Sequence, residues 1–150
     1  MKLLSYLHNK LLFTLQDVAI EMGNTRSAQA LLMRYQRQGY ISKVRRGLYC
    51  VNNIASLLPE VNKFQVASAV TSTSYVAYHA AMEYHGLAHQ VYYDVAVGGE
   101  QPFNSFEFDG NNYSFRHIAT HVGVDTPIAD SHVRVTNVER TVIDCIDRID

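Results

Sequence analysis

The sequence holds few of the residues from which disulfide frameworks and thiolate metal sites are built. It has two cysteines in 150 residues. Neither Cys50 nor Cys145 belongs to a Cys-x-x-Cys pair. Disulfide-stapled folds and thiolate zinc sites need more cysteines than this, at closer spacing. We therefore expect a reduced, cytoplasmic protein without a cysteine-based site.

Long apolar runs are missing as well. The opening residues 1–13 contain several leucines, but a polar triplet at positions 8–10 interrupts them before a signal-peptide core could form. No later run approaches the length that a membrane span requires. The sequence therefore predicts no membrane insertion. Residues 1–13 are predicted to form the first helix of a domain, with Leu4, Leu7 and Leu11 packed on its neighbours.

Motifs of common catalytic sites are also missing. Gly98-Gly99 follows a predicted strand but lacks the Gly-Lys-Ser/Thr ending of a phosphate-binding loop. No serine has the spacing of a nucleophile elbow. Asp94 and Glu107 lie on predicted strands, as nuclease carboxylates do, but the lysine that metal-dependent nucleases place nearby is missing. We expect no enzymatic activity.

Two histidine pairs four residues apart raise the question of a metal site. Gly86 breaks the predicted helix between His85 and His89. His117 and His121 lie on or after a strand, where residues four apart sit too far from each other for easy chelation. We therefore expect no metal and no cofactor. His79 and His85 are instead predicted to be half-buried, with hydrogen-bond partners.

The charges are distributed unevenly along the chain. Residues 1–53 hold eight Lys and Arg against two Asp and Glu, a net charge of +6. Residues 54–150 hold five against twelve, a net charge of −7. A basic region attracts polyanions, whereas an acidic one is repelled by them. The sequence therefore predicts two domains, 1–53 and 54–150, of which the first binds nucleic acid and the second faces a protein partner or solvent.

The basic region carries the pattern of a helix-turn-helix. Thr14 and Asp17 nearly match a capping box at the start of one short helix, which Gly23 ends. A second helix follows the cap at Asn24 and runs to Gly39. Its predicted inner face consists of Ala28, Leu31, Leu32 and Tyr35.

A predicted hairpin completes a winged helix-turn-helix. Residues 40–44 and 48–51 have strand composition, and the basic turn 45–47 joins them. A helix in the major groove needs polar and cationic groups on its outer face, and a wing tip needs cations beside phosphate. Arg can bind guanine through two hydrogen bonds, and Gln can bind adenine. The predicted DNA contacts are Thr25, Arg26, Ser27, Gln29, Arg34 and Arg37 on the helix and Lys43, Arg45 and Arg46 on the wing.

The second domain is predicted to be a small α+β domain with helices and an antiparallel sheet. A turn at 109–112 indicates a hairpin. Thr71–Ser74 has the composition of a helix cap, and Thr136 with Glu139 has the spacing of a capping box. Helices are predicted at 63–70, 75–84 and 138–149, and strands at 91–97, 106–108, 113–118 and 133–135. Because the chain stops in or at the edge of the last helix, we expect a fragment of a longer protein.

Three sequence blocks resemble one known family. RRGLYCV, SYVAYHAAMEYHGL and VRVTNVERTVIDCIDR are similar, in this order, to blocks of the AbiEi antitoxins of type IV, abortive-infection toxin-antitoxin systems. The resemblance implies a winged helix that represses its own operon at promoter repeats, and a region that neutralises a nucleotidyltransferase-like toxin. It implies DNA-reading positions at Arg26, Ser27, Gln29, Arg34, Arg45 and Arg46. Family members usually continue past this length.

The main hypothesis is thus a sequence-specific DNA-binding transcriptional repressor, an autoregulating antitoxin of antiviral defence. A lone winged helix covers few base pairs, so we expect a homodimer or paired sites on double-stranded DNA. In a second interpretation the chain is a protein-interaction module that holds a partner without binding DNA, and the arginine-rich helix is only a solvated face. In a third interpretation the chain is a nuclease or another enzyme built on the small sheet. Within the last helix, Arg140 and Asp144 are predicted to pair.

Overall fold

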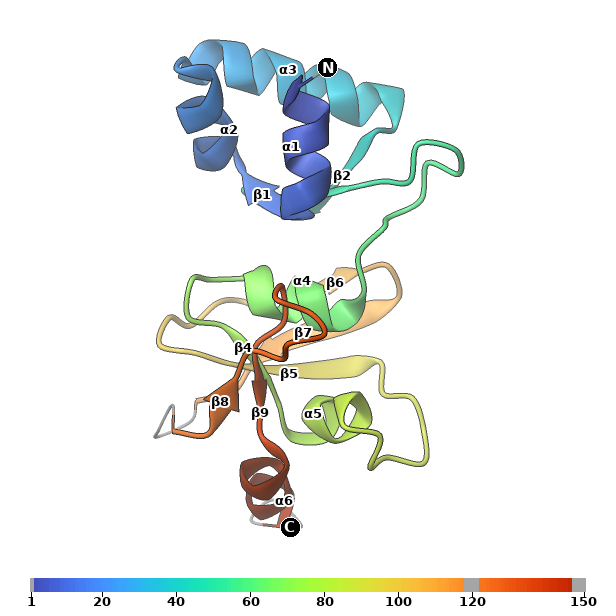
Figure 1. Cartoon of the computed structure of the whole chain (residues 1–150), viewed down its shortest axis with the longest axis vertical. Helices are drawn as coiled ribbons and strands as arrows, with labels where there is room; N and C mark the ends of the chain where they lie inside the picture. Colours follow the sequence, from blue (N-terminus) through green and yellow to red (C-terminus); the bar gives the residue numbers. More distant parts are fainter. Residues whose placement is uncertain (1, 118–121, 147–150) are drawn as a thin grey trace. The chain divides into compact units, whose positions relative to one another are not determined.

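The computed structural model describes residues 2–117 and 122–146 (Figure 1). The chain forms two compact units, Met1–Asn62 and Lys63–Asp150. The described residues form six helices and two sheets, which make this a mixed α+β structure. Three predicted features lie outside the described residues: Ile118 of one strand, His121 of a histidine pair, and the end of the 138–149 helix.

The first unit packs three helices around a small antiparallel sheet. Its strands are hydrogen-bonded in the order β1-β3-β2. The predicted helix 1–13 is wrong at its end: it stops at Lys10, and Leu12–Thr14 form β1, a strand that three residues beside a helix do not reveal by any readable alternation. In chain order the elements are α1 (Lys2–Lys10), β1 (Leu12–Thr14), α2 (Leu15–Met22), α3 (Thr25–Gln38), β2 (Ile41–Arg45) and β3 (Leu48–Val51).

Helices α2 and α3 begin and end where the sequence predicted. The Thr14 hydroxyl accepts a hydrogen bond from the Asp17 amide at 3.1 Å, and the Asp17 carboxylate accepts one from the Thr14 amide at 2.9 Å. Gly23 ends α2 in the left-handed conformation. The Asn24 side chain then caps α3, which ends at Gly39. These caps fix the tight turn between the helices.

Apolar side chains from all three helices and the sheet form the core of this unit. Leu4 and Leu7 are buried as predicted, whereas Leu11 is only partly buried. The predicted inner face of α3 is confirmed, since Leu31 is partly buried against the same core and the other three residues are fully buried. The buried members are Leu4, Leu7, Phe13, Val18, Ala19, Ala28, Leu32, Tyr35, Ile41 and Val51.

The second unit is a six-stranded mixed sheet with helices packed against it. The prediction of an antiparallel sheet is wrong in part: the strand order is β6-β7-β5-β4-β9-β8, and the pairs β4–β9 and β5–β7 are parallel, whereas the other three pairs are antiparallel. Helices α4 and α5 lie on opposite sides of the sheet, and α6 packs on α5 (Figure 1). The elements are α4 (Lys63–Ala69), β4 (Tyr75–Ala77), α5 (Tyr78–Tyr84), β5 (Asp94–Gly98), β6 (Phe106–Phe108), β7 (Asn111–Phe115), β8 (Val124–Asp125), β9 (Val135–Thr136) and α6 (Val138–Ile146).

The predicted helix 75–84 is wrong over its first three residues. Tyr75–Ala77 is strand β4, which lies between β5 and β9 and is buried throughout. A short apolar strand buried on both faces cannot be told from a helix by periodicity. The predicted cap is wrong as well, because Ser74 bonds the Thr71 amide in a turn and α5 begins without a side-chain cap.

The predicted capping box of the last helix is also wrong. The side chain of Asn137 accepts a hydrogen bond from the Arg140 amide at 2.9 Å and so caps α6. The Thr136 hydroxyl is instead buried against the Thr141 hydroxyl at 2.6 Å. The hairpin prediction holds, with a shorter loop: Phe108 pairs with Asn111, so only two residues turn.

Candidate nucleic-acid interface

The outer face of α3 is polar and basic. One face of this 14-residue helix packs its apolar residues Ala28, Leu31, Leu32 and Tyr35 against the core, and the opposite face forms a long outward surface. All six residues predicted on this face are exposed: Thr25, Arg26, Ser27, Gln29, Arg34 and Arg37. The guanidinium of Arg34 lies 5.9 Å from the centre of the Tyr35 ring, which holds this cation close to its own helix. The face can therefore offer several cations and amides to a polyanion.

Two residues on this face were not predicted as contacts. Ala30 and Met33 are exposed, and the Met33 side chain keeps 57% of its surface accessible. With Arg26 and Arg37 they follow spacings of four, three and four residues, so the four share one stripe of the helix. We call these four residues the outer stripe. The helical spacing alone could have identified Ala30 and Met33, but the prediction selected only polar residues.

The hairpin β2–β3 carries the remaining predicted contacts. Its turn at Arg46 and Gly47 is exposed, and Gly47 has the positive φ of 84° that such a tight turn requires. Lys43 is exposed and lies opposite Tyr49 in the sheet, whereas Arg45 is half-buried beside an irregularity in the register. The turn and the Lys43 side chain are therefore open to a ligand, and Arg45 is held partly within the unit.

A buried asparagine joins the hairpin to the end of α3. The Asn52 side chain donates a hydrogen bond to the Gly39 carbonyl and accepts one from the Ser42 hydroxyl, each at 2.9 Å. The Asn52 amide donates to the Tyr40 carbonyl. Because Asn52 is almost fully buried and its groups are paired, it fixes the exit from α3 and the return of β3 relative to each other.

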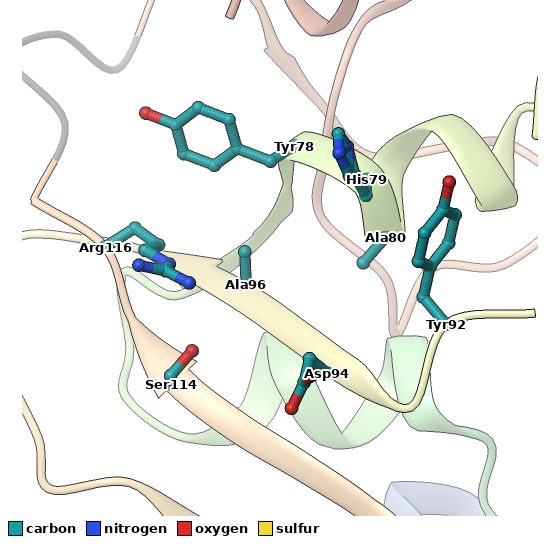
Figure 2. A pocket seen from close by; sticks show the side chains of 8 residues that line it. All are labelled: Tyr78, His79, Ala80, Tyr92, Asp94, Ala96, Ser114 and Arg116. Atoms are coloured by element: carbon teal, nitrogen blue, oxygen red, sulfur yellow. The ribbon is translucent and has the colours of Figure 1, made fainter. Parts of the chain in front are cut away.

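The second unit has an open pocket on one face of its sheet. Its volume is about 320 Å³. Figure 2 shows Tyr78 and His79, at the start of α5, on one side of it and side chains of β5 and β7 on the other. Of its residues, only Asp94 and His79 were weighed for chemistry from the sequence. The lining residues are Tyr78, His79, Ala80, Tyr92, Asp94, Ala96, Ser114 and Arg116.

The histidines of the second unit make local contacts. The ring of His85 is half-buried, with Nε2 at 2.7 Å from the Thr136 carbonyl, as predicted. The prediction for His79 is wrong in part, since its ring is exposed, although Nδ1 lies 3.7 Å from the Cys145 thiol. Within residues 2–117 and 122–146, no group of three or more His, Cys, Asp or Glu side chains is placed to hold a metal ion.

The predicted Arg140–Asp144 pair is confirmed. The Arg140 Nε lies 3.3 Å from the Asp144 carboxylate, and both side chains are largely buried. Arg140 also lies over the Tyr75 ring, 5.8 Å from its centre. Burial raises the pKa of the Tyr75 phenol, and Arg140 opposes that shift. Burial, with a smaller contribution from Asp144, raises the pKa of the Cys145 thiol. These groups therefore belong to the packing between α6 and the sheet.

The first unit thus combines a basic outer helix face with a basic hairpin turn, a combination typical of transcriptional regulators. Residues 1–52 match the model of a family described as a transcriptional regulator, AbiEi antitoxin. The predicted resemblance is confirmed over these residues, in which the chain is similar to the AbiEi antitoxins. No curated protein matches the chain. None of the helices in the described residues is long and apolar enough to cross a membrane.

Proposed function

We propose that this protein is a sequence-specific transcriptional repressor that binds double-stranded DNA through a winged helix-turn-helix at residues 1–53. In this proposal α2 and α3 are the helix-turn-helix, α3 enters the major groove, and β2–β3 is the wing. The observation that carries it is the exposure of six polar or cationic α3 residues on the same unit as a basic hairpin turn. The net charge of +6 in residues 1–53 adds a general attraction to DNA.

The contacts divide into two kinds. Arg26 and Gln29, in the first turns of α3, are assigned to base edges, because the N-terminal residues of a recognition helix usually reach them. The other residues are assigned to phosphate or supporting contacts: Thr25, Ser27, Arg34 and Arg37 on α3, and Lys43, Arg45 and Arg46 on the wing. Binding of this kind needs no catalytic step, and we propose that the protein is not an enzyme.

The AbiEi family gives the proposal its biological setting. The chain would repress its own operon in a type IV toxin-antitoxin system of antiviral defence, at promoter repeats occupied by a homodimer or by separate copies. The second unit would hold the cognate nucleotidyltransferase-like toxin. The net charge of −7 in residues 54–150 supports a protein partner rather than DNA for this unit.

A titration of the whole chain against its own upstream promoter DNA and a scrambled duplex, at two salt concentrations, tests the proposal. We expect tight binding to the promoter only, weakening steeply as salt rises, since each phosphate contact releases counterions. The double variant Arg45→Ala, Arg46→Ala should weaken binding to both duplexes and flatten the salt slope by about 0.9 log unit for each phosphate that is no longer neutralised. Arg116→Ala, which removes an exposed cation of the second unit, is the matched control.

Equal and weak binding to both duplexes would contradict the repressor and favour the second candidate, a protein-interaction module. One observation supports that candidate: α6 exposes the apolar side chains of Val142, Ile143 and Ile146. Exposed apolar side chains gathered on one helix are typical of a surface that binds another protein. The neighbouring gene product would then be expected to co-purify with the wild-type chain but not with Ile143→Ser.

A further inference from the structure

The outer stripe of α3 has a cation at each end and an apolar pair in the middle. Arg26 and Arg37 are exposed, and between them lie Ala30 and Met33, which is 57% exposed. At a rise of 1.5 Å per residue the two arginines are about 16 Å apart along the axis, and the apolar pair is about 4.5 Å apart. With a rise of 3.4 Å per base pair along the duplex axis, the stripe can span at most about five base-pair steps and the pair about one.

The apolar pair is too small to be a surface for another protein. A stable protein interface buries about 800 Å² on each partner around a cluster of large side chains. Here, Gln29 and Arg34 lie close beside the pair and both are exposed. A narrow apolar patch inside a basic, polar helix face is suited instead to a ligand that presents small apolar groups within an array of negative charge.

Duplex DNA presents one such group in its major groove, the C5-methyl of thymine. Every other base edge there offers hydrogen-bond donors or acceptors. Ala30 has no side-chain group to pair with those and Met33 has only a weakly accepting thioether, and covering an unpaired polar edge costs free energy. A thioether chain and a β-methyl gain free energy when they cover a methyl group. Ala30 and Met33 are therefore suited to T·A pairs, whose thymine methyl group they can contact. They are unsuited to G·C pairs, whose polar edges would lose water without gaining a hydrogen-bond partner.

We propose that Ala30 and Met33 are specificity-determining residues that contact thymine methyl groups on neighbouring base pairs, at the centre of a half-site flanked by the contacts of Arg26 and Arg37. This inference rests on the proposed function and extends it, because it names a base composition for the operator. The half-site has thymines at its centre, and a guanine is expected on the side that Arg26 reaches.

The test begins with selection of tight-binding duplexes from a random pool by the whole chain. The winning duplex is then made with deoxyuridine, which lacks the C5-methyl group, in place of its central thymines. Burial of one methyl-sized group corresponds to about fourfold in affinity, so we expect a loss of about fourfold per contacted thymine. Deoxyuridine placed only in the flanking base pairs should leave the affinity unchanged. This duplex controls for an effect of deoxyuridine on DNA flexibility.

Variants assign the effect to the residue. Met33→Ala should bind the thymine duplex less tightly and lose most of the deoxyuridine penalty, because the group that senses the methyl is gone. Ile20→Ala is the matched control, since Ile20 is an apolar residue 71% exposed on α2. It should keep the full penalty. Both variants alter exposed side chains, so thermal unfolding should match the wild type.

The outcomes separate the inference from the function on which it rests. A selected motif whose affinity is unchanged by deoxyuridine, or a penalty that persists in Met33→Ala, overturns the methyl contact and leaves the repressor intact. A change of oligomeric state in Met33→Ala, measured by light scattering, together with an undiminished penalty, assigns Met33 to self-association and also overturns the inference. Failure of the selection to yield any motif overturns the proposed function itself.

Discussion

Among single residues, Arg140 connects several parts of the second unit that lie far apart in the chain. Its Nη1 donates to the Val122 carbonyl at 2.6 Å, its Nε lies 3.3 Å from the Asp144 carboxylate, and its guanidinium lies over the Tyr75 ring. A guanidinium can make these contacts together because its donors point in fixed directions within one plane. The Arg140 side chain thus links its own helix α6 to the segment at Val122 and to strand β4.

The first prediction concerns this side chain. Arg140→Ala should lower the free energy of unfolding by about 1–3 kcal/mol, because it leaves polar partners unpaired in a largely buried place. Arg140→Lys should recover only a small part of the lost free energy of unfolding, since an ammonium group cannot reproduce the planar donor geometry of the guanidinium. Urea denaturation measures both variants. Arg116→Ala removes an exposed cation from the same unit and should be neutral, and a similar loss in that variant would point to net charge instead.

The second prediction concerns alkaline pH. Burial raises the pKa of the Tyr75 phenol from its ordinary value of 10.0 and the pKa of the Cys145 thiol from 9.0. Above these values the unfolded chain releases protons that the folded chain retains, so stability should fall as pH rises from about 9. Tyr75→Phe should reduce the loss of stability above pH 10. Cys145→Ala should reduce the loss of stability that begins near pH 9. Denaturation midpoints between pH 7 and 11 measure this, and parallel curves for all three proteins would contradict it.

Individual side chains also mark the limit of prediction from sequence. Thr136 and Glu139 have the spacing of a capping box, but the Thr136 hydroxyl is used by Thr141, and Asn137 caps the helix. Local spacing cannot show that a hydroxyl is needed by a partner elsewhere. The exposed α3 residues, by contrast, could be predicted, because a strong apolar period on one side of a helix fixes what lies on the other.

At the level of elements, strand pairing between β4 and β5 depends on a close approach. Gly98 lies opposite Tyr75 in the register, and a Cβ at Gly98 would meet the Tyr75 ring at 2.5 Å. The Tyr75 ring therefore lies over Gly98 and occupies the space that a larger residue there would need. Sequence alone could not reveal this match, since it joins residues far apart in the chain, one of which lay in a predicted helix.

The third prediction follows from this match. Gly98→Ala should destabilise the second unit by about 1–3 kcal/mol, the usual cost of overpacking a well-packed site. Tyr75→Leu in the Gly98→Ala background should recover part of the loss, because the ring that blocks the new methyl group is gone. Gly110→Ala is a useful comparison, since nothing lies within 4 Å of the added group and only its positive φ of 84° opposes the change. Additive effects of the Gly98 and Tyr75 changes would contradict the contact.

Helices and strands were predicted correctly where the capping residues and the spacing of apolar residues indicate the same element. They were missed where neither signal is present. Helix α3 has a capping asparagine, a closing glycine and a regular apolar face, and its bounds were predicted closely. Strands β1 and β8 have three and two residues and no pattern of their own. Their positions are set by pairing with β3 and β9, which only the folded chain provides.

At the scale of the whole molecule, the two compact units carry opposite charge. Unit Met1–Asn62 has eight basic and three acidic residues, a net charge of +5, and the rest has five and eleven, a net charge of −6. A near-neutral chain therefore contains a basic and an acidic part. The acidic part repels the polyanion that the basic part is proposed to bind, over distances that depend on salt.

The fourth prediction compares the whole chain with residues 1–62 alone. The fragment has its own core and sheet and should fold, as circular dichroism would show. At low salt it should bind promoter DNA more tightly than the whole chain, because the acidic unit is gone. The difference should shrink as salt rises and the Debye length falls to about 8 Å at 0.15 M. A constant difference at all salt concentrations would mean that the second unit acts by contact, not by charge.

The arrangement of the second sheet could not be predicted at this scale. Parallel pairs join β4 to β9 and β5 to β7 across long intervening segments. Hydrophobic alternation indicates which residues form a strand but not which strand lies beside it. The antiparallel sheet was predicted because the one readable turn joins neighbours in the chain. The charge division between the units, in contrast, was visible in the sequence.

Asn52 has a consequence for the speed and cost of association. Its side-chain NH2 group donates to the Gly39 carbonyl and its side-chain oxygen accepts from the Ser42 hydroxyl, so the end of α3 and the β2–β3 hairpin are held together without a ligand. A flexible wing would lose conformational freedom on docking and so weaken the complex. If α3 and the hairpin bind DNA as proposed, a hairpin held in place beforehand would avoid that entropy loss, and an encounter would need only the right orientation to become productive.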